Sequence, residues 1–234
     1  MKLNKQKFVV FLKKIMMTGT EQIKEAKFSF TDEGLKVGVQ PESKTVKNFG
    51  MLLPQAFIAY EAIGDIAIQD LPTFVKLVSK FKDEISVTVT ESKIKLDDGY
   101  KQVEFDLMDV QFIKDVSPIK DLTFDETFTV NISDIQEMIE DFKSVNDAAI
   151  TLKLETVQKG LILSNTGKYK FKRNISVPEA NGGVVTSMGD VFKNSIEALT
   201  HDCVFSMKTN FPIKILEKTE DSVINLVVAP TVSK

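Results

Sequence analysis

The sequence is poor in the residues on which most catalytic and redox chemistry depends. It has one cysteine, one histidine and no tryptophan among 234 residues. The single cysteine, Cys203, excludes an internal disulfide framework and is typical of a reducing compartment. His201 lies two residues before it, and no further cluster of candidate ligands or catalytic partners accompanies the pair. Because a zinc site needs about four ligands and a cysteine nucleophile needs a supporting base, we interpret the pair as structural and predict no metal, no cofactor and no enzymatic activity.

The chain also lacks a long apolar run. None reaches the roughly 18 residues that a membrane helix needs. The first residues, MKLNKQKFVVFLKKIMMTG, begin with basic and then apolar residues, as a signal peptide would. Lys13 and Lys14 interrupt the apolar stretch, and no small-residue cleavage site follows. We therefore interpret this segment as an amphipathic helix and expect an intracellular protein.

Positive charge is carried almost wholly by lysine. The net charge is −3 and the isoelectric point about 5.4, which argues against a basic coat over the whole surface. Arg173 is the single arginine. Readers of specific DNA sequence favour arginine for paired contacts with guanine, whereas lysine suits phosphates, which carry no sequence information. The composition favours sequence-independent contacts if nucleic acid is bound at all.

One pattern, an amphipathic helix followed by alternating strands, recurs four times along the chain. The apolar stripes of the four helices are Phe8, Phe11, Leu12, Ile15 and Met16; Leu71, Phe74, Val75, Val78 and Phe81; Ile135, Met138, Ile139 and Phe142; and Phe192, Ile196 and Leu199. The strand-like stretches include FSFTDEGLKVGV, ISVTVTESKIKLDDGYKQVEFDL, AITLKLETVQKGLILSNTGKYKFKRNI and SVINLVVAP. Each helix should span about three turns. The pattern predicts an α+β fold in which each helix lies on antiparallel strands.

Helix starts are marked by residues that cap N-termini. Asp70 and Pro72 introduce the second helix. A capping box of Ser133 and Gln136 is expected to open the third helix, and Ser187 the fourth, with Asp190 three residues on. The segment Asn181-Gly182-Gly183 indicates a loop rather than a phosphate cradle, since no Walker motif is present.

The repeat divides the chain into two similar domains, residues 1–110 and 124–234. Between them, residues 111–123 have no clean period and contain Pro118. A connection of this length is either an ordinary surface loop or a functional segment. The isolated apolar residues Val116 and Ile119 favour a docking surface.

The chain resembles the DNA sliding clamps, the family of proliferating cell nuclear antigen and the phage clamps. The resemblance is carried by LMDVQFIKDVSP at the connector, by NFPIKILEKTEDSVINLVVAPTV at the C-terminus and by the start MKLNK before an amphipathic helix. It implies two domains, each with two helices packed on antiparallel sheets, in a homotrimeric closed ring around duplex DNA. The implied function is a polymerase processivity factor whose partners are a DNA polymerase and a clamp-loader ATPase, at replication sites in a phage-infected cytoplasm or a nucleus.

The resemblance also implies roles for particular residues. The clamp helices would present lysines to DNA phosphates, here Lys7, Lys13, Lys14, Lys76, Lys80, Lys143 and Lys193. The third helix carries Glu137, Glu140 and Asp141 outward, so we expect an uneven positive lining. Without the resemblance, these lysines would be read as solubilising side chains.

Two oppositely charged segments occupy the places where neighbouring clamp subunits pair. The acidic strand YKQVEFDLMD carries Glu104, Asp106 and Asp109, and the basic strand KYKFKRNIS carries Lys168, Lys170, Lys172 and Arg173. Complementary charge would help select the partner. The alternative is that edge charges only prevent aggregation.

A peptide-binding pocket is implied beneath the connector. Its residues would be Val46, Val116, Pro118, Ile119, Ala229, Pro230 and Val232. The alternative is that these apolar residues pack within the subunit and bind nothing. The rival for the whole chain is a β-rich polymerase accessory or interaction protein that does not close into a ring.

Overall fold

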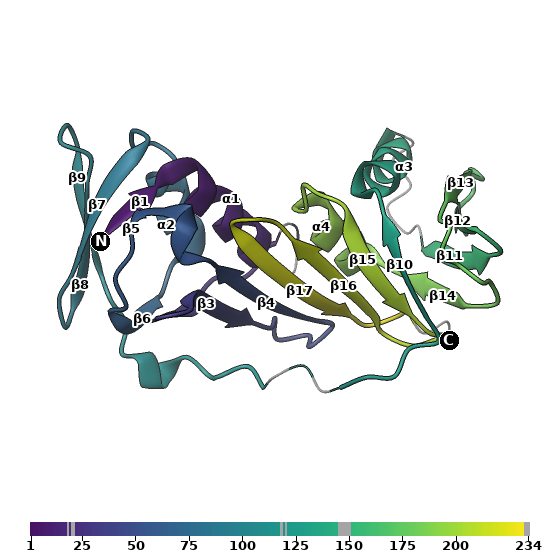
Figure 1. Ribbon diagram of the computed structural model, residues 1–234, viewed down its shortest axis with the longest axis horizontal. Helices are drawn as coiled ribbons and strands as arrows, with labels where there is room; N and C mark the ends of the chain where they lie inside the picture. Colours follow the sequence, from purple (N-terminus) through teal and green to yellow (C-terminus); the bar gives the residue numbers. More distant parts are fainter. Residues whose placement is uncertain (18, 20–21, 118, 120, 145–150, 232–234) are drawn as a thin grey trace. The chain divides into compact units, whose positions relative to one another are not determined.

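The computed structural model describes residues 1–17, 19, 22–117, 119, 121–144 and 151–231 (Figure 1). Two compact units are present. Unit 1 comprises Met1–Glu42, Asn48–Ser117 and Thr219–Ile224, and unit 2 comprises Ser43–Lys47, Pro118–Lys218 and Asn225–Lys234. The domain boundaries expected at residues 110 and 123 stay a prediction.

Unit 1 holds two helices and most of the first nine strands. Its elements are β1 (Lys2–Asn4), α1 (Lys5–Met16), β2 (Ala26–Thr31), β3 (Gly34–Val39), β4 (Val46–Leu52), the 3-10 turn η2 (Pro54–Ala56), β5 (Phe57–Ala59), β6 (Gly64–Ile68), α2 (Leu71–Val78), β7 (Glu84–Val89), β8 (Lys93–Asp97), β9 (Gln102–Asp106) and η3 (Val110–Phe112). One sheet has the order β5-β1-β7-β8-β9, and a second run of strands has the order β4-β3-β2-β6. Neighbouring strands within these sheets pair antiparallel.

Unit 2 repeats this plan with its own strands. Its elements are β10 (Glu126–Val130), α3 (Ile132–Ser144), β11 (Leu152–Val157), β12 (Gly160–Asn165), β13 (Lys172–Ser176), β14 (Val185–Met188), α4 (Asp190–Glu197), β15 (Cys203–Met207), β16 (Ile213–Lys218) and β17 (Ser222–Val228). The strands follow the orders β10-β15-β16-β17 and β13-β12-β11-β14. These match β1-β7-β8-β9 and β4-β3-β2-β6 strand for strand, so the predicted repeat is present as a repeat of topology. In it β17 is the counterpart of β9, and β13 is the counterpart of β4.

The helices of unit 1 begin where their capping residues predict. Asn4 Oδ1 accepts a hydrogen bond from the backbone N–H of Lys7 at 3.2 Å. Asp70 Oδ1 accepts from the N–H of Thr73 at 3.0 Å, which holds the pKa of Asp70 below its usual range, and Pro72 occupies the first turn. The start of α2 predicted from Asp70 and Pro72 is therefore confirmed.

The helix starts expected in unit 2 are wrong. α3 begins at Ile132, and Asn131 Oδ1 accepts from the N–H of Ser133 at 3.0 Å. Asn131 takes the capping role because it immediately precedes the first helical residue, two residues before Ser133. Gln136 donates to the carbonyls of Ile196 and Leu199 at 3.0 and 2.9 Å, so it joins α3 to the end of α4 instead of closing a capping box.

The start of α4 is displaced by a strand. Ser187 belongs to β14, and α4 begins at Asp190 with Gly189 as a cap that lacks a side-chain bond. Two helices are also shorter than the expected three turns, since α2 and α4 have eight residues each. Phe81 lies beyond the end of α2, although it is buried as predicted.

The helices bury aromatic stripes against the strands. In unit 1, Phe8 of α1 and Phe74 of α2 meet edge to face at 6.4 Å, and Phe105 of β9 lies 5.0 Å from Phe74. Gly50 of β4 allows α1 to approach closely, because a Cβ atom there would come within 2.3 Å of the Ile15 side chain. β4 was not predicted, since its buried Asn48 and Gly50 break the apolar alternation. In Figure 1, α1 lies beside α2 in unit 1, and α3 beside α4 in unit 2.

Candidate nucleic-acid interface and sheet edges

The helix pair of unit 1 carries exposed lysines with no acidic partner among the described residues. Lys13 lies in the last turn of α1, Lys76 lies in α2, and Lys80 follows the end of α2. Because α1 and α2 pack through Phe8 and Phe74, their apolar faces turn toward the sheet, and the lysines remain on the solvent side. Their charge is available to an anionic surface.

Two other lysines of α1 depart from the predicted face. Lys14 is only 3% exposed, so it does not share the solvent face with Lys13. The side-chain amide of Asn48 in β4 donates to the Lys14 carbonyl at 2.8 Å, so β4 packs against this part of α1. Lys7 forms an ion pair with Asp221 at 2.8 Å inside unit 1. The sequence missed both outcomes because neither the burial nor the distant partner is visible in local spacing.

The helix pair of unit 2 has its lysines neutralised. Lys143 lies 2.7 Å from Glu140 and 2.9 Å from Glu197, and these hydrogen-bonded carboxylates, Glu140 first, raise the pKa of Lys143. Lys193 pairs with Asp190 at 2.5 Å, and its side chain is 13% exposed. The uneven positive lining expected from the acidic residues of α3 stays a prediction, and these ion pairs are the observations that favour it.

The two charged strands lie at the edges of their sheets. β9 pairs with β8, and β13 pairs with β12; neither has a second partner among the described residues. Leu107 donates to the carbonyl of Ser92, and Val177 to that of Lys159. Since backbone groups alternate in direction along a strand, those of Glu104 in β9 and Asn174 in β13 point away from the sheet. Both edges are open to a further strand.

β9 and β13 are shorter than the charged segments in which we predicted them. Asp109 lies beyond β9 and caps η3 by accepting from the N–H of Gln111 at 3.0 Å. Lys168 and Lys170 lie before β13, which begins at Lys172. Glu104, Asp106 and Lys172 remain as exposed charges on the edge strands themselves.

Arg173 has two acidic partners within its own unit. Its guanidinium lies 2.6 Å from Glu137 and 3.2 Å from Asp134, so it ties β13 to α3 within unit 2. The hydrogen bond to Glu137, and to a smaller extent the negative charge of Asp134, raise the pKa of Arg173. The side chain is 31% exposed. Its place in a subunit interface stays a prediction, and within the subunit the guanidinium already has two acidic partners.

The connector begins with an anchored stretch in unit 1. Lys27 of β2 forms an ion pair with Asp115. Val116 lies over β3, where a Cβ atom built on Gly38 would be 3.6 Å from it. The first residues of the connector also form η3, which the sequence did not predict. This part of the connector is therefore held against its own sheet.

The residues expected to line a peptide pocket have different environments. Val46 is buried, whereas Val116, Ile119, Ala229 and Pro230 are half-buried. Pro118 and Val232 lie outside the described residues. Ala229 is held by a backbone bond from its N–H to the carbonyl of Thr45 at 2.8 Å within unit 2.

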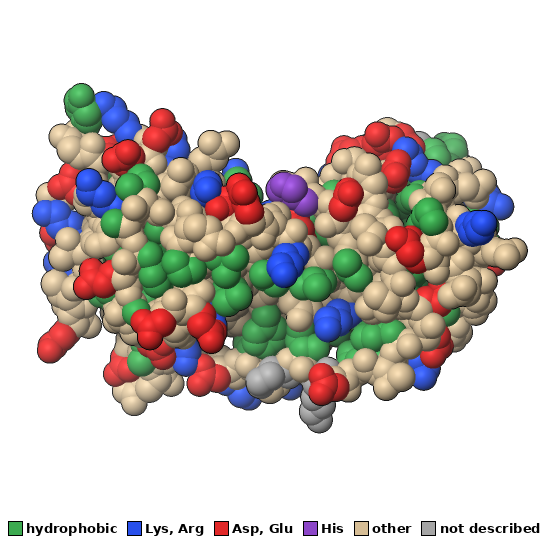
Figure 2. Space-filling model, viewed as in Figure 1, with side chains coloured by type: hydrophobic (Ala, Val, Ile, Leu, Met, Phe, Trp, Pro, Cys, Tyr) green, Lys and Arg blue, Asp and Glu red, His purple; other side chains and the backbone are tan. Residues whose placement is uncertain are grey.

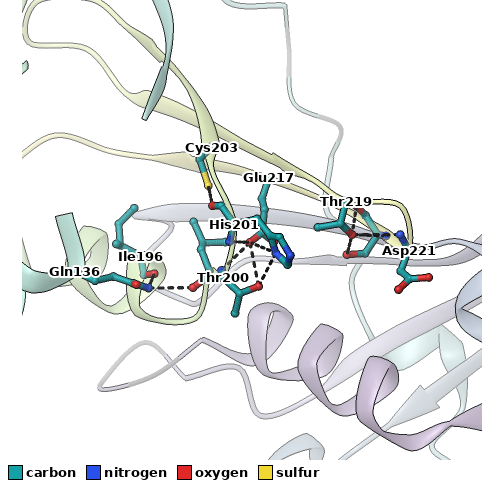
Figure 3. Close-up of polar contacts among 10 residues, drawn as sticks. Gln136, Ile196, Thr200, His201, Cys203, Glu217, Thr219 and Asp221 are labelled. Carbon is teal, nitrogen blue, oxygen red and sulfur yellow. Dashed lines mark hydrogen bonds and ion pairs between the residues drawn. The ribbon is translucent and has the colours of Figure 1, made fainter. Parts of the chain in front are cut away.

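His201 and Cys203 belong to a structural turn. Cys203 is fully buried, and its thiol donates to the carbonyl of His201 at 3.2 Å. Glu217, also fully buried, accepts from the backbone N–H groups of Thr200 and His201 at 2.7 and 2.9 Å (Figure 3). The carboxylate holds the turn that follows α4, because buried backbone N–H groups outside a helix or sheet need an acceptor. No sequence pattern marked Glu217, since a lone glutamate in a strand is usually exposed.

Acidic and basic side chains are interspersed over the visible face in Figure 2, without a continuous basic coat. Within the described ranges, no group of three His, Cys, Asp or Glu residues is arranged to hold a metal ion. No described helix has the length and apolar character of a membrane span.

Comparisons with known proteins find DNA sliding clamps both in sequence and in fold. No family model matches the chain. The DNA polymerase sliding clamp of Nanoarchaeum equitans is 26% identical over 182 residues, which cover 75% of this chain and 72% of that protein. The structure of A. fulgidus PCNA bound to the C-terminal region of FEN-1 matches with a TM-score of 0.86 at 14% identity, over 100% of this chain and 98% of that one.

Two further PCNA structures have the same fold. Entamoeba histolytica PCNA has a TM-score of 0.79 at 16% identity, covering 99% of this chain and 98% of its own. The PCNA2–PCNA3 complex of Sulfolobus tokodaii gives 0.76 at 17%, with 98% of both chains covered. This chain is therefore similar in sequence to a DNA polymerase sliding clamp and shares the fold of the PCNA structures, in agreement with its repeated topology.

Proposed function

We propose that three copies of this chain close into a ring around duplex DNA and hold a DNA polymerase at the primer end. The observation that carries the ring is the pair of open sheet edges, β9 acidic and β13 basic. The relative from N. equitans is named a DNA polymerase sliding clamp, which supports the polymerase as partner.

The internal repeat supports pairing of these two edges. Within unit 1, the outer side of β4 is covered by the segment Thr219–Ile224, which contains the first residues of β17: the N–H of Leu53 donates to the carbonyl of Asp221 at 2.8 Å. In the repeat, β13 is the counterpart of β4 and β9 the counterpart of β17. The β9 strand of another copy would therefore cover β13 as β17 covers β4. Each copy offers one β9 and one β13, so head-to-tail contacts generate a closed ring when the rotation closes.

DNA contact in the proposed ring rests on unit 1. Lys13, Lys76 and Lys80 would touch phosphates without reading sequence. Such binding is weak, with dissociation constants of about 10⁻⁴–10⁻⁶ M, so the closed ring and not affinity would keep the protein on DNA. The ring raises the effective concentration of the polymerase at the primer end without catalysing a reaction. A separate clamp-loader ATPase would open it.

The polymerase would bind through a short peptide at the connector. Ile119, Ala229 and Pro230 are half-buried, so part of their apolar surface meets solvent. Clefts with apolar walls are the usual sites for such anchors. The A. fulgidus PCNA structure, with its bound C-terminal region of FEN-1, supports peptide docking as the mode.

The ring is tested by mass and by DNA topology. Light scattering coupled to size exclusion should give about three times the 26.2 kDa of one chain. After loading, the protein should remain on closed circular DNA and be lost when the same DNA is cut once, because only a linear molecule has ends to slide from. If the protein is a monomer and binds circular and linear DNA equally, the ring is wrong, and the non-ring polymerase accessory protein is the better interpretation.

A further inference from the structure

Unit 1 contains a groove whose lining includes none of the helix lysines. It is formed by three segments, within residues 61–66, 89–92 and 107–110, and has a volume of about 860 Å³. These are the loop before and into β6, the turn between β7 and β8, and the chain that leaves β9. All three lie inside unit 1, so the groove is complete within that unit.

One wall of the groove is an unpaired strand edge. β6 pairs with β2, with Phe28 opposite Ile66 and Ser29 opposite Asp65. On its other side, Met108 donates to the carbonyl of Ala67 at 3.1 Å and forms an isolated bridge. The chain then turns into η3 at Val110, so the bridge does not continue. Since the backbone groups of alternate residues point the same way, the N–H and C=O of Asp65 face the groove beside this bridge.

The groove combines an apolar floor with an acidic rim. Ile66 is 4% exposed, and Ile63, Met108 and Val110 are half-buried, so apolar surface lines its base. The lining carboxylates are Glu61, Asp65, Glu91 and Asp109, and the lining contains no lysine or arginine.

Two of these carboxylates already have cations nearby. Asp65 lies 3.7 Å from Lys27, and Glu61 lies 3.6 Å from the amino group of Met1. Glu91 and Asp109 form no ion pair with any described residue. The rim therefore keeps uncompensated negative charge on both sides of the groove.

We propose that this groove binds an extended basic segment of a partner protein, which adds a strand beside β6 at Asp65. An incoming backbone supplies the donors and acceptors that the open edge lacks. Side chains of a strand alternate between its two faces, so apolar residues at every second position would meet the floor, and lysines or arginines between them would reach Glu91 and Asp109. The site is separate from the proposed peptide site at the connector and does not depend on ring formation.

A synthetic probe tests the chemistry directly. The probe is a blocked peptide of about six residues, a common strand length, that alternates lysine and valine; the control peptide alternates glutamate and valine. Calorimetry on the full chain at physiological salt should detect the first and not the second. Hydrogen exchange of the Asp65 amide, followed by NMR, should slow by at least about tenfold at saturation, because that N–H becomes bonded.

Matched variants separate the groove from general attraction to an acidic protein. The double variant Glu91→Gln with Asp109→Asn keeps the hydrogen-bonding groups, including the cap of η3. It should lower the affinity for the lysine peptide by about threefold to tenfold. Glu42→Gln with Glu179→Gln removes the same charge from exposed positions elsewhere and should leave its affinity unchanged. Asp65→Pro, which removes the outward N–H, should abolish binding, whereas Asp65→Asn should retain most of it.

Three results would overturn the proposal. They are equal weakening by both charge pairs, unchanged exchange at the Asp65 amide under saturating peptide, and dissociation of the native oligomer on binding, which would place the groove in a contact between copies. If Asp65→Pro does not fold, the amide exchange of the unmodified protein still decides the question. Loss of the ring in the earlier test would leave this result unaffected, so failures of the two proposals are distinguishable.

Discussion

The two units share one strand order and differ in the charge that their helices expose. In unit 1, Lys13, Lys76 and Lys80 have no acidic partner among the described residues. In unit 2, Lys143 and Lys193 are paired with carboxylates. The same buried stripes build both helix pairs, so packing does not dictate the outward residues. The difference teaches that topology and surface charge vary independently in this chain.

The sheet edges show a second contrast between the units. β9 of unit 1 exposes Glu104 and Asp106, and β13 of unit 2 exposes Lys172. Each edge repels a copy of itself and attracts the other, which favours head-to-tail contacts over self-pairing. The contrast therefore predicts a direction of assembly as well as its existence.

The largest effect is expected from proline at either edge. Glu104→Pro or Asn174→Pro removes an N–H that points away from its own sheet, so the subunit should fold while the added strand cannot pair. Light scattering should show monomers at micromolar concentration for each variant. Unfolding midpoints measured by circular dichroism should stay near those of the unmodified chain, and a trimer from both variants would move the contact to other strands.

A charge exchange sharpens the same comparison. Lys170→Glu with Lys172→Glu should weaken the trimer, and adding Glu104→Lys with Asp106→Lys should restore part of it, because a double-mutant cycle isolates the pairing. Arg173 is left in place, since its reversal would also disturb Glu137 on α3.

The next largest effect concerns binding of the partner peptide. We propose this role for the connector and the C-terminal tail, and not for either helix pair. Ile119→Asp, or removal of residues 230–234, should weaken binding of the polymerase's terminal peptide by about thirtyfold, or about 2 kcal/mol. Calorimetry measures the affinity and light scattering confirms the oligomer. Affinities within about twofold of the unmodified protein for both variants would show that these residues pack internally.

Charge reversal on the helices tests directly the difference in exposed lysines between the two units. Lys76→Glu with Lys80→Glu should lower processivity, because these charges act on phosphates within a Debye length of about 8 Å at physiological salt. Lys143→Glu with Lys193→Glu is the matched reversal in unit 2 and should lower it less. Primer-extension length under single-hit conditions gives the measurement, and equal losses would contradict the assignment of DNA contact to unit 1.

The smallest effect is a gain in unit 2. Glu140→Gln with Glu197→Gln releases Lys143 from both carboxylates, so the pKa of Lys143 should fall toward its ordinary value while the side chain stays charged at neutral pH. DNA affinity should rise by about twofold at low salt. NMR titration of the Lys143 amino group and fluorescence anisotropy with duplex DNA measure the two changes.

Sequence alone predicted the elements whose signals are local. Asp70 and Pro72 marked the start of α2, and the apolar stripes of the four helices are buried except for the half-buried Met16. The errors arose where neighbouring residues compete for one role. Asn131 stands beside Ser133, and either can cap a helix.

The length of the basic edge strand β13 was overestimated for a different reason. The alternation in KYKFKRNIS predicts a strand, but Asn165 holds the chain in a turn there: its side chain donates to the carbonyl of Tyr169 at 2.6 Å and accepts from the N–H of Phe171 at 2.7 Å. Contacts between residues far apart in sequence, such as Lys7 with Asp221 and Arg173 with Asp134, decide which charges remain free. Spacing rules do not contain that information.

The burial of Cys203 makes the chain suited to site-directed labelling. Its thiol is fully enclosed and engaged with the carbonyl of His201, so reagents for surface thiols should leave the native protein unmodified. Cysteines introduced at Glu104 and Asn174 would then be the reactive pair, one on each edge strand. Dyes attached there would report the opening and closing of single subunit contacts by energy transfer, and a disulfide between them would lock a contact shut.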